Sequence, residues 1–257
     1  MIETLQARSA QETLLLEARR LNKSFGGLRA LRDVDLDIRR GEIMALVGDN
    51  GAGKSTLIKV LSGALVPDSG EIRIEDRAVT LSSPNDATAL GIETVHQSLG
   101  LVDELDVPQN VFLGRELMRR VLGVPVLDKA EMRKRTVKLL ENFSIGLPTL
   151  NEPVRRLSGG QRQTIAISRL LLSEPKLLIM DEPMAALGVD EGSKVLALVE
   201  RLRERGLTTL IISHNLEHVF KLADRIAVMK NGSMVGIVKT SDVTRDQIVR
   251  MITFGRS

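Results

Sequence analysis

The sequence contains no cysteine, tryptophan or tyrosine, and phenylalanine, present five times, is its only large aromatic residue. Without cysteine, no disulfide framework can form. So few aromatic rings argue against a stacking platform for single-stranded nucleic acid. No apolar run approaches the length of about 18 residues that spans a bilayer, so the sequence predicts no membrane-spanning helix. The first residues lack the basic-then-apolar pattern of a secretion signal, which predicts a cytosolic location.

The charge of the chain is nearly balanced. Its 257 residues include 36 basic and 33 acidic side chains, a net charge of +3. The basic pairs are scattered along the chain rather than gathered in blocks, which is typical of solvated faces. We therefore expect no nucleic-acid partner. The length suits one large domain or a domain with an inserted subdomain.

Apolar patterns divide the chain into three regions. The first is rich in expected strands, and the last alternates helices with apolar strands, which predicts a mostly parallel, buried sheet. Between them, from about 98 to 151, lies a region with one long amphipathic helix that starts near Asp128, with Asp128 and Glu131 as its capping pair and Leu139, Leu140 and Phe143 on one face. The expected strands occupy 14–20, 29–38, 42–47, 71–75, 91–96, 176–180 and 207–213, a hairpin joins 225–229 to 234–238, and the other helices occupy 54–62, 160–172, 190–205 and 215–222.

The stretch "GDNGAGKST" follows an apolar strand and opens a helix, as a phosphate-binding loop does. Its glycines let backbone N–H groups curl around phosphate oxygens, and the helix N-terminus adds partial positive charge. We expect Lys54 to reach the β- and γ-phosphates of a nucleotide and Ser55 to bind Mg²⁺. The candidate nucleotide-binding residues of this loop are Gly48, Asn50, Gly51, Ala52, Gly53, Lys54, Ser55 and Thr56.

Polar side chains follow three of the expected strands. Asp181 and Glu182 end an apolar strand, where ligands sit in an open parallel sheet. Asp181 is placed to hold Mg²⁺, and Glu182 to orient and deprotonate the attacking water. His214 ends the next strand and is a candidate contact for the γ-phosphate. Gln97 ends an earlier strand and is a candidate for Mg²⁺ and water. Each is also an ordinary residue for a strand end when taken alone.

A second glycine-rich turn, "LSGGQ" at 157–161, has no lysine of its own. Together with the phosphate loop, Gln97, the Asp181–Glu182 pair and His214, it resembles the ATPase subunit of ABC transporters, in the order and spacing of that family. The resemblance covers almost the whole chain. It implies an α/β fold: a P-loop ATPase core with a mostly parallel sheet, an N-terminal antiparallel β-region and an inserted helical subdomain. It places one ATPase domain at 10–257, with the subdomain at about 98–173.

The resemblance also implies roles for individual residues. Phe25 stands where an aromatic ring stacks on adenine, although a core position for it stays open. Glu182 is the catalytic base, and Gln97 links the site to the subdomain. The turn residues that would face the γ-phosphate of a partner subunit are Ser158, Gly159, Gly160 and Gln161. Two positions depart from the family: Met184 replaces a usual threonine or serine, and Gly188 replaces a usual aspartate, while Asp190 fits better as a helix N-terminal acid.

The stretches "GIETVHQSLGLVDELDVPQNVFLGRE" and "ISHNLEHVFKLADRI" resemble ATPases of monosaccharide importers of the ribose, xylose and fructose kind, in their single-domain form. This implies a homodimer that binds two ATP and Mg²⁺, works with a membrane permease and a periplasmic sugar-binding protein, and lies at the cytoplasmic face of the inner membrane. The permease is expected to dock near 98–114. Two alternatives stay open: a soluble ABC ATPase that acts on ribosomes or DNA, and an adaptor without turnover.

Overall fold

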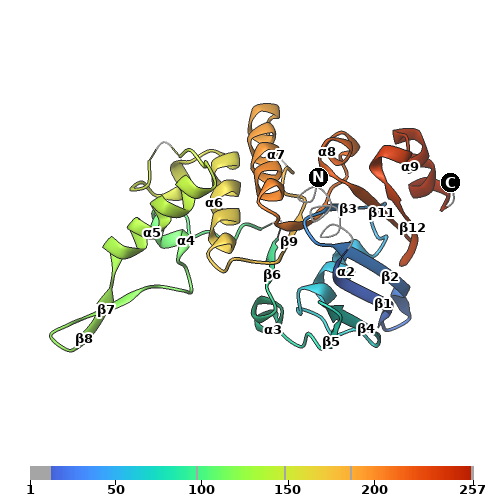
Figure 1. Ribbon diagram of the computed structural model, residues 1–257, viewed down its shortest axis with the longest axis horizontal. Coiled ribbons are helices and arrows are strands. Elements are labelled where there is room, and N and C mark those ends of the chain that lie inside the picture. The colour runs from blue at the N-terminus through green and yellow to red at the C-terminus, as the bar shows by residue number, and fades with distance from the viewer. Residues whose placement is uncertain (1–12, 97, 148, 186, 256–257) are drawn as a thin grey trace, which may run out of the picture. The chain divides into compact units, whose positions relative to one another are not determined.

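The computed structural model describes residues 13–96, 98–147, 149–185 and 187–255. The chain forms two compact units. The described residues of 13–94, 175–183 and 203–255 form the sheet unit, and the described residues of 95–174 and 184–202 form the helical unit. Figure 1 gives the labels of the elements used below.

Among the described residues, one six-stranded sheet of the sheet unit has the order β12-β11-β3-β10-β9-β6. Its central strand β3 pairs in parallel with β10 and β11, and β10 pairs in parallel with β9. Strand β12 pairs antiparallel with β11 through the Asn231–Gly232 turn. The bounds of these strands are β3 Ile43–Val47, β6 Ile92–Val95, β9 Leu177–Asp181, β10 Thr208–Ile212, β11 Arg225–Lys230 and β12 Ser233–Lys239.

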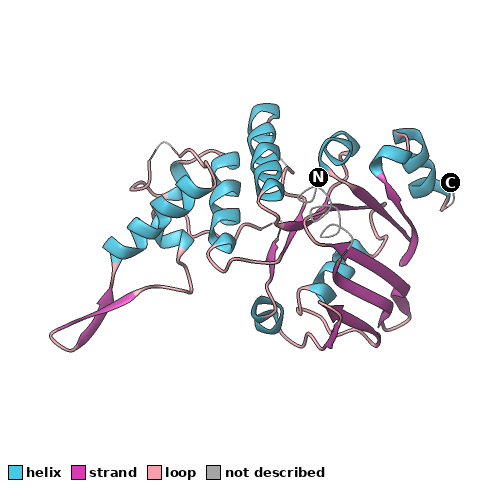
Figure 2. Ribbon diagram, viewed as in Figure 1, coloured by secondary structure: helices cyan, strands magenta, loops and turns pink. Residues whose placement is uncertain are grey.

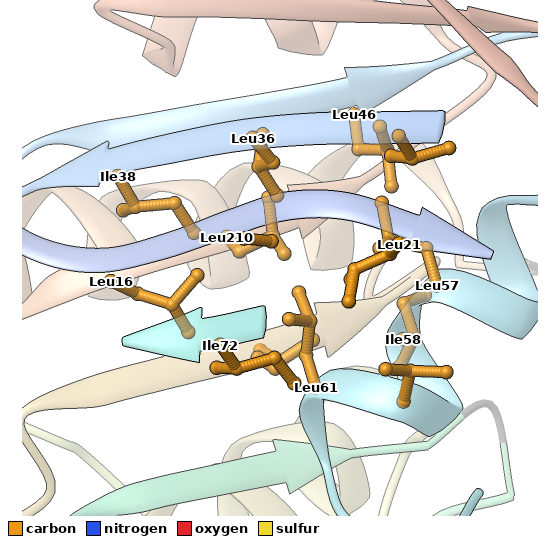
Figure 3. Close-up of a cluster of buried hydrophobic side chains, with 14 of the residues drawn as sticks. Leu16, Leu21, Leu36, Ile38, Leu46, Leu57, Ile58, Leu61, Ile72 and Leu210 are labelled. Atoms are coloured by element: carbon orange, nitrogen blue, oxygen red, sulfur yellow. The ribbon is translucent and has the colours of Figure 1, made fainter. Parts of the chain in front are cut away.

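A four-stranded antiparallel sheet has the order β2-β1-β4-β5. Its strands are β1 Leu14–Phe25, β2 Leu28–Arg39, β4 Ser69–Ile74 and β5 Arg77–Val79. Between the two sheets and helix α2, Lys54–Leu61, lies the main hydrophobic core (Figure 3). Leu21, Leu36 and Leu57 are among its fully buried side chains. Burying apolar surface in this way is the dominant stabilisation of such a unit, and it holds the phosphate loop between β3 and α2.

Within its described residues, the sheet unit has three further helices: α3 Pro84–Ala89, α8 Leu216–Leu222 and α9 Arg245–Phe254. Helix α8 begins after Asn215, whose side chain accepts hydrogen bonds from the next helical N–H groups. The expected strands and helices of the first and last regions are confirmed, with bounds that differ by a few residues at most ends. Strand β1 is longer than expected, and α3 and β5 were not anticipated.

The helical unit has its own small core, formed by residues that include Val107, Phe112 and Ile165. Its helices are α4 Val107–Val111, α5 Lys129–Asn142, α6 Gly159–Leu171 and α7 Val189–Glu204, and a 3-10 turn lies at Val154–Arg156. Helix α5 starts after Asp128, whose side chain accepts a hydrogen bond from the Glu131 N–H, as the sequence predicted.

The sequence predicted neither helix α4 nor the hairpin of this unit. Strands β7, Met118–Val121, and β8, Val124–Leu127, form a two-stranded hairpin that extends away from helices α4 and α5 (Figure 2). Its side chains are mostly exposed. Because neither face is buried, the strands lack the alternation of buried and exposed residues by which strands are found in a sequence.

No helix among the described residues is both long and apolar enough to cross a membrane.

Candidate functional site

The phosphate loop joins a buried strand to a helix with an open N-terminus. Strand β3 is buried along its whole length, and α2 begins at Lys54. Gly53 precedes it in the left-handed conformation, with φ of 100°, and no side chain caps the helix. The first N–H groups of a helix have no partner within it, so they are available to an anion, which the helix dipole also favours. The loop therefore fits the phosphates of a nucleotide.

Gly48 is required by a close approach of the backbone. A Cβ atom at this position would lie 2.3 Å from the carbonyl oxygen of Met229 on β11, and its φ is 154°. Strand β11 pairs with β3 directly beside the loop. Any side chain at position 48 would push the loop away from its supporting strand, so the glycine keeps the loop in place.

The side chain of Lys54 lies over the loop. Its Nζ donates hydrogen bonds to the carbonyl oxygens of Gly48, at 2.7 Å, and Asp49, at 2.9 Å. Burial lowers the pKa of the Lys54 ammonium, while the negative charges of Glu182, Asp49 and Asp181 act to raise it. The structure thus brings the phosphate loop and the acidic pair near each other, as the sequence predicted. A phosphate group would add further negative charge beside this half-buried ammonium and so favour its charged form.

Glu182 and His214 are in direct contact. Strands β9 and β10 are parallel neighbours, with Asp181 opposite Ile212, so the residues that follow them meet at one sheet edge. The Nδ1 atom of His214 lies 2.9 Å from Oε1 of Glu182. The Glu182 N–H donates to the carbonyl of Ile212, and its φ is 51°. A left-handed backbone is uncommon for glutamate, and such strain gathers at functional sites.

The two side chains differ in exposure. That of Glu182 is 20% exposed and that of His214 is 76% exposed. A carboxylate that is mostly shielded from water and held by an imidazole has a fixed direction, which a general base needs. The exposed ring of His214 can meet a ligand at the surface of the sheet unit.

The oxygen atoms near the loop fit a magnesium ion. Ser55 lies in the first turn of α2, and Asp181 ends β9. Hydroxyl and carboxylate oxygens are ligands that Mg²⁺ prefers, and Mg²⁺ is usually held by one or two carboxylates plus substrate phosphates. In the part of the chain that the structure describes, no group of three or more His, Asp or Glu side chains could hold a metal by itself. The donor set therefore fits Mg²⁺ that arrives with a nucleotide.

Phe25 ends strand β1 and is 49% exposed. This excludes the alternative of a core phenylalanine. The Nζ atom of Lys23 lies 5.9 Å from the centre of the ring, within the range of a cation–π contact. An accessible ring is what stacking on a base requires.

The LSGGQ turn opens helix α6 of the helical unit. Ser158 is its N-cap: Oγ accepts from the Gln161 N–H, at 3.4 Å, and the Gln161 Oε1 accepts from the Ser158 N–H, at 2.9 Å. This reciprocal pair is a capping box. Because Oγ acts there as an acceptor, its O–H group can still donate to a phosphate oxygen. The N–H groups of Gly159 and Gly160 belong to the first turn, where no intrahelical acceptor exists.

The glycines of this turn are needed for packing. A Cβ atom on Gly160 would lie 2.9 Å from Cβ of Glu191 in the first turn of α7, closer than real Cβ atoms approach. A Cβ atom on Gly159 would lie 3.0 Å from Cδ2 of Leu187, the end of a flexible side chain. Sequence reasoning missed Glu191 and Leu187, since no pattern in the sequence pairs α6 with the start of α7.

Other predicted residues have mixed outcomes. Gln97 lies outside the described residues. Met184 is 8% exposed and so is buried. The Gly188 carbonyl accepts from the Gly192 N–H at the start of α7, and Asp190 lies in the first turn of that helix, as expected.

The expected docking segment at 98–114 is partly core. Val107 is fully buried, and Leu101 packs against the same cluster, so these two side chains belong to the core of the helical unit. Leu99 is half-buried, and Val102 is 38% exposed. The fully buried Asn110 holds the loop before α4: its side chain accepts from the Val102 N–H and donates to that residue's carbonyl. Sequence reasoning missed this residue.

Comparison with known proteins decides the family. Residues 31–185 match the family described as ABC transporter. The chain belongs to the ABC transporter family. It is 44% identical to the xylose/arabinose import ATP-binding protein XylG of Sulfolobus acidocaldarius, over 93% of this chain and 94% of that one. It is 44% identical to the fructose import ATP-binding protein FrcA of Rhizobium meliloti, over 95% of each.

Solved structures of the family have the same fold. A dimeric structure of a post-hydrolysis state of an ATP-binding cassette, bound to ADP and Pi, is 26% identical, covers 88% of this chain and 99% of that chain, and has a TM-score of 0.72. The ABC chain described here is thus an ATP-binding cassette and an ATPase, and the predicted fold class is confirmed.

Proposed function

We propose that this ABC cassette is the ATP-hydrolysing subunit of a sugar importer, and that its transported class is a monosaccharide. The observation that carries the proposal is the match to the xylose/arabinose and fructose import proteins along nearly the full length of each. The described phosphate loop, acidic pair and histidine supply the ATPase machinery that such a subunit needs. The sugar itself would contact a separate membrane permease and a periplasmic binding protein, so this chain alone does not select it.

ATP is the substrate at the loop. Lys54 and the open N-terminus of α2 would bind its β- and γ-phosphates, and Phe25 would stack on its adenine ring. Ser55 and Asp181 would hold Mg²⁺, together with Gln97, and the ion would neutralise charge on the phosphates. Glu182 would take the proton of the attacking water, and the hydrogen bond to His214 keeps its carboxylate in place. His214 would contact the γ-phosphate from the exposed side.

Hydrolysis would need two copies of the chain. The LSGGQ turn offers a hydroxyl, two N–H groups and a helix dipole, but it has no lysine or Mg²⁺ ligand of its own. Such a turn can bind a phosphate that a second loop also holds. We propose that each copy presents this turn to the ATP held by its partner, so that a homodimer closes on two ATP molecules. That a related cassette forms a dimer with ADP and Pi bound supports the homodimer.

The permease would dock on the helical subdomain near 98–114. The loop at 101–106 has a defined shape because Asn110 holds it, and Val102 is exposed on it. The subunit would then work at the cytoplasmic face of the inner membrane. A Val102→Asp variant should lose co-purification with the permease and keep ATP binding; unchanged co-purification would refute the docking site.

The catalytic assignment is tested with Glu182→Gln. The amide keeps the shape of the side chain and cannot accept the water proton, so ATP should bind, hydrolysis should fall by at least about a hundredfold, and an ATP-bound dimer should accumulate in gel filtration. The control Glu217→Gln changes a surface glutamate of α8 and should hydrolyse ATP at the wild-type rate. Wild-type turnover in Glu182→Gln would refute the assignment of the base.

Co-purification tests the transport assignment. The wild-type chain should bring down a permease with a sugar-binding protein. Stimulation of its ATPase by RNA or DNA, with no permease bound, would overturn the proposal in favour of a ribosome- or DNA-acting ATPase.

A further inference from the structure

The hairpin β7–β8 carries apolar side chains on both of its faces. Cross-strand partners point to the same side of a sheet, so Met118 and Leu127 share one face, while Val121 and Val124 share the other. All four are between 42% and 59% exposed. A two-stranded ribbon is at best marginally stable in water without packing on one face, and contiguous exposed apolar surface marks an interaction site. The described part of the chain therefore leaves both faces of the hairpin exposed.

Its tip is a leucine in an unfavourable place. Leu122 is 101% exposed and has a φ of 50°, beside Gly123 with a φ of 86°. Two-residue hairpin turns with two positive φ values favour Asn, Asp or Gly at the first position. A leucine there costs backbone strain and leaves its whole side chain in water. Both effects destabilise the free protein, so we expect the Leu122 side chain to contribute free energy when the hairpin is bound.

Basic charge surrounds this apolar tip. Arg119 and Arg120 lie on opposite faces of β7 and are exposed. The hairpin leads directly into α5, because the Asp128 N–H that precedes this helix donates to the carbonyl of Leu117. Residues 118–142 contain seven basic and three acidic side chains, a net charge of +4, whereas the whole chain has +3. The rest of the chain therefore has a net charge of −1.

We propose that the β7–β8 hairpin inserts its tip into the interface of an anionic lipid bilayer. Apolar side chains on both faces and at the tip suit a medium that surrounds the ribbon, whereas a protein partner would cover one face. Arginines beside the apolar residues would meet lipid phosphates, and the basic α5 would add attraction to an anionic surface. This contact is independent of the transported sugar and of ATP hydrolysis. It would give the cassette a second attachment besides its permease.

A single tryptophan can test the insertion, because the chain has none. In the full chain, Leu122→Trp should shift its emission to shorter wavelengths when vesicles of phosphatidylcholine and phosphatidylglycerol are added, and lipids with brominated acyl chains should quench it. The matched control is Phe254→Trp, at a position that is 75% exposed in α9, and it should show neither effect. An unshifted spectrum of Leu122→Trp with these vesicles would overturn the proposal. A shift that needs the permease in the vesicles would also overturn it, in favour of a protein partner.

Charge and apolar contributions can be separated by vesicle co-sedimentation. Leu122→Asp with Val124→Asp should lower binding at least about tenfold. Arg119→Gln with Arg120→Gln should lower binding to the anionic vesicles by a similar factor and leave the weak binding to pure phosphatidylcholine unchanged. Phe254→Asp should bind as the wild type does. All variants should keep the wild-type ATPase rate in solution, which shows that they fold and separates this proposal from the proposed function. Wild-type vesicle binding by both double variants would refute the insertion.

Discussion

The contact between Gly160 and Glu191 leads to a prediction about the LSGGQ turn. Non-bonded carbon atoms are at their best separation at about 3.5–4.0 Å. A Cβ atom on Gly160 would lie 2.9 Å from the Glu191 Cβ and 3.4 Å from its Cα. These atoms belong to the backbone end of the residue, so a rotamer change of Glu191 cannot relieve the clash. The first turns of α6 and α7 would have to separate by about half an ångström or more.

Two opposing effects set the expected change in the free energy of unfolding. Overpacking of this kind costs about 1–3 kcal/mol. Alanine in a helix gains up to about 1 kcal/mol over glycine, and less in the first turn. Gly160→Ala should therefore lower the free energy of unfolding by about 1–2 kcal/mol. The matched control is Gly192→Ala in α7, where the added Cβ atom has no neighbour within 4 Å. It should raise the free energy of unfolding by about 0.5–1 kcal/mol.

Urea unfolding followed by circular dichroism measures both variants against the wild type. ATP turnover is measured in parallel. Gly160→Ala should lower turnover because the N–H groups of the turn move, and it should keep ATP binding because the phosphate loop is in the sheet unit. If both alanines raised the stability alike, or if Gly160→Ala hydrolysed ATP at the wild-type rate, the packing argument for this glycine would be refuted.

Three further predictions concern the sheet unit. Arg225→Met should lower the free energy of unfolding, measured with urea, by about 3 kcal/mol. The substitution removes the ion pairs from Arg225 to Asp37, at 2.8 Å, and Glu42, at 3.3 Å. Burial raises the pKa of Glu42, and the loss of Arg225 should raise this pKa further. The variant should therefore regain the lost stability as the pH falls through the pKa of Glu42; a loss of stability that grows on acidification would contradict this reasoning. His214→Ala should lower kcat about tenfold to a hundredfold, which is the contribution of a hydrogen bond to a charged group; an unchanged kcat would show that the 2.9 Å contact with Glu182 has no catalytic role. Lys54→Met should abolish the rise in Tm that ATP produces, without lowering the Tm of the free protein, because burial already disfavours the ammonium; a rise in Tm with ATP that persists would contradict this.

Local signals predicted most of the sheet unit. The residue types of the phosphate loop between β3 and α2 are those that phosphate binding requires. The Asn231–Gly232 turn is specific for a hairpin. The sequence placed Glu182 and His214 at the ends of successive apolar strands, but it did not predict that the two side chains pair. Neighbouring parallel strands present their ends at one edge, which explains why these residues meet.

The helical unit was predicted less well. In α5, the expected apolar face was Leu139, Leu140 and Phe143. Leu140 is buried and Leu139 packs against the core as expected, but Met132 and Thr136 are buried as well. Thr136 can be buried because its hydroxyl donates to the Met132 carbonyl. A hydrogen bond within the helix hides a polar side chain from any pattern based on hydropathy. The hairpin was missed because its apolar residues are exposed.

Contacts between distant segments were beyond the reach of sequence reasoning. Met229 explains Gly48, and Glu191 explains Gly160, yet each pair is joined only by the folded backbone. A glycine in a motif indicates that a neighbouring atom leaves no room for a Cβ atom, but the sequence does not show which atom this is.

The pairing of β3 has a consequence for the time at which the site can form during protein synthesis. The ribosome completes the phosphate loop by residue 56, but β3 is held in the sheet by β10 and β11, beginning with Thr209 opposite Ile43. At about 5–20 residues per second, this part of the chain waits roughly 8 to 35 seconds for its neighbours. During this interval a nascent chain carries an apolar strand with two open edges. A stalled or shortened chain that ends before β10 should therefore not bind ATP, although its loop is complete in sequence.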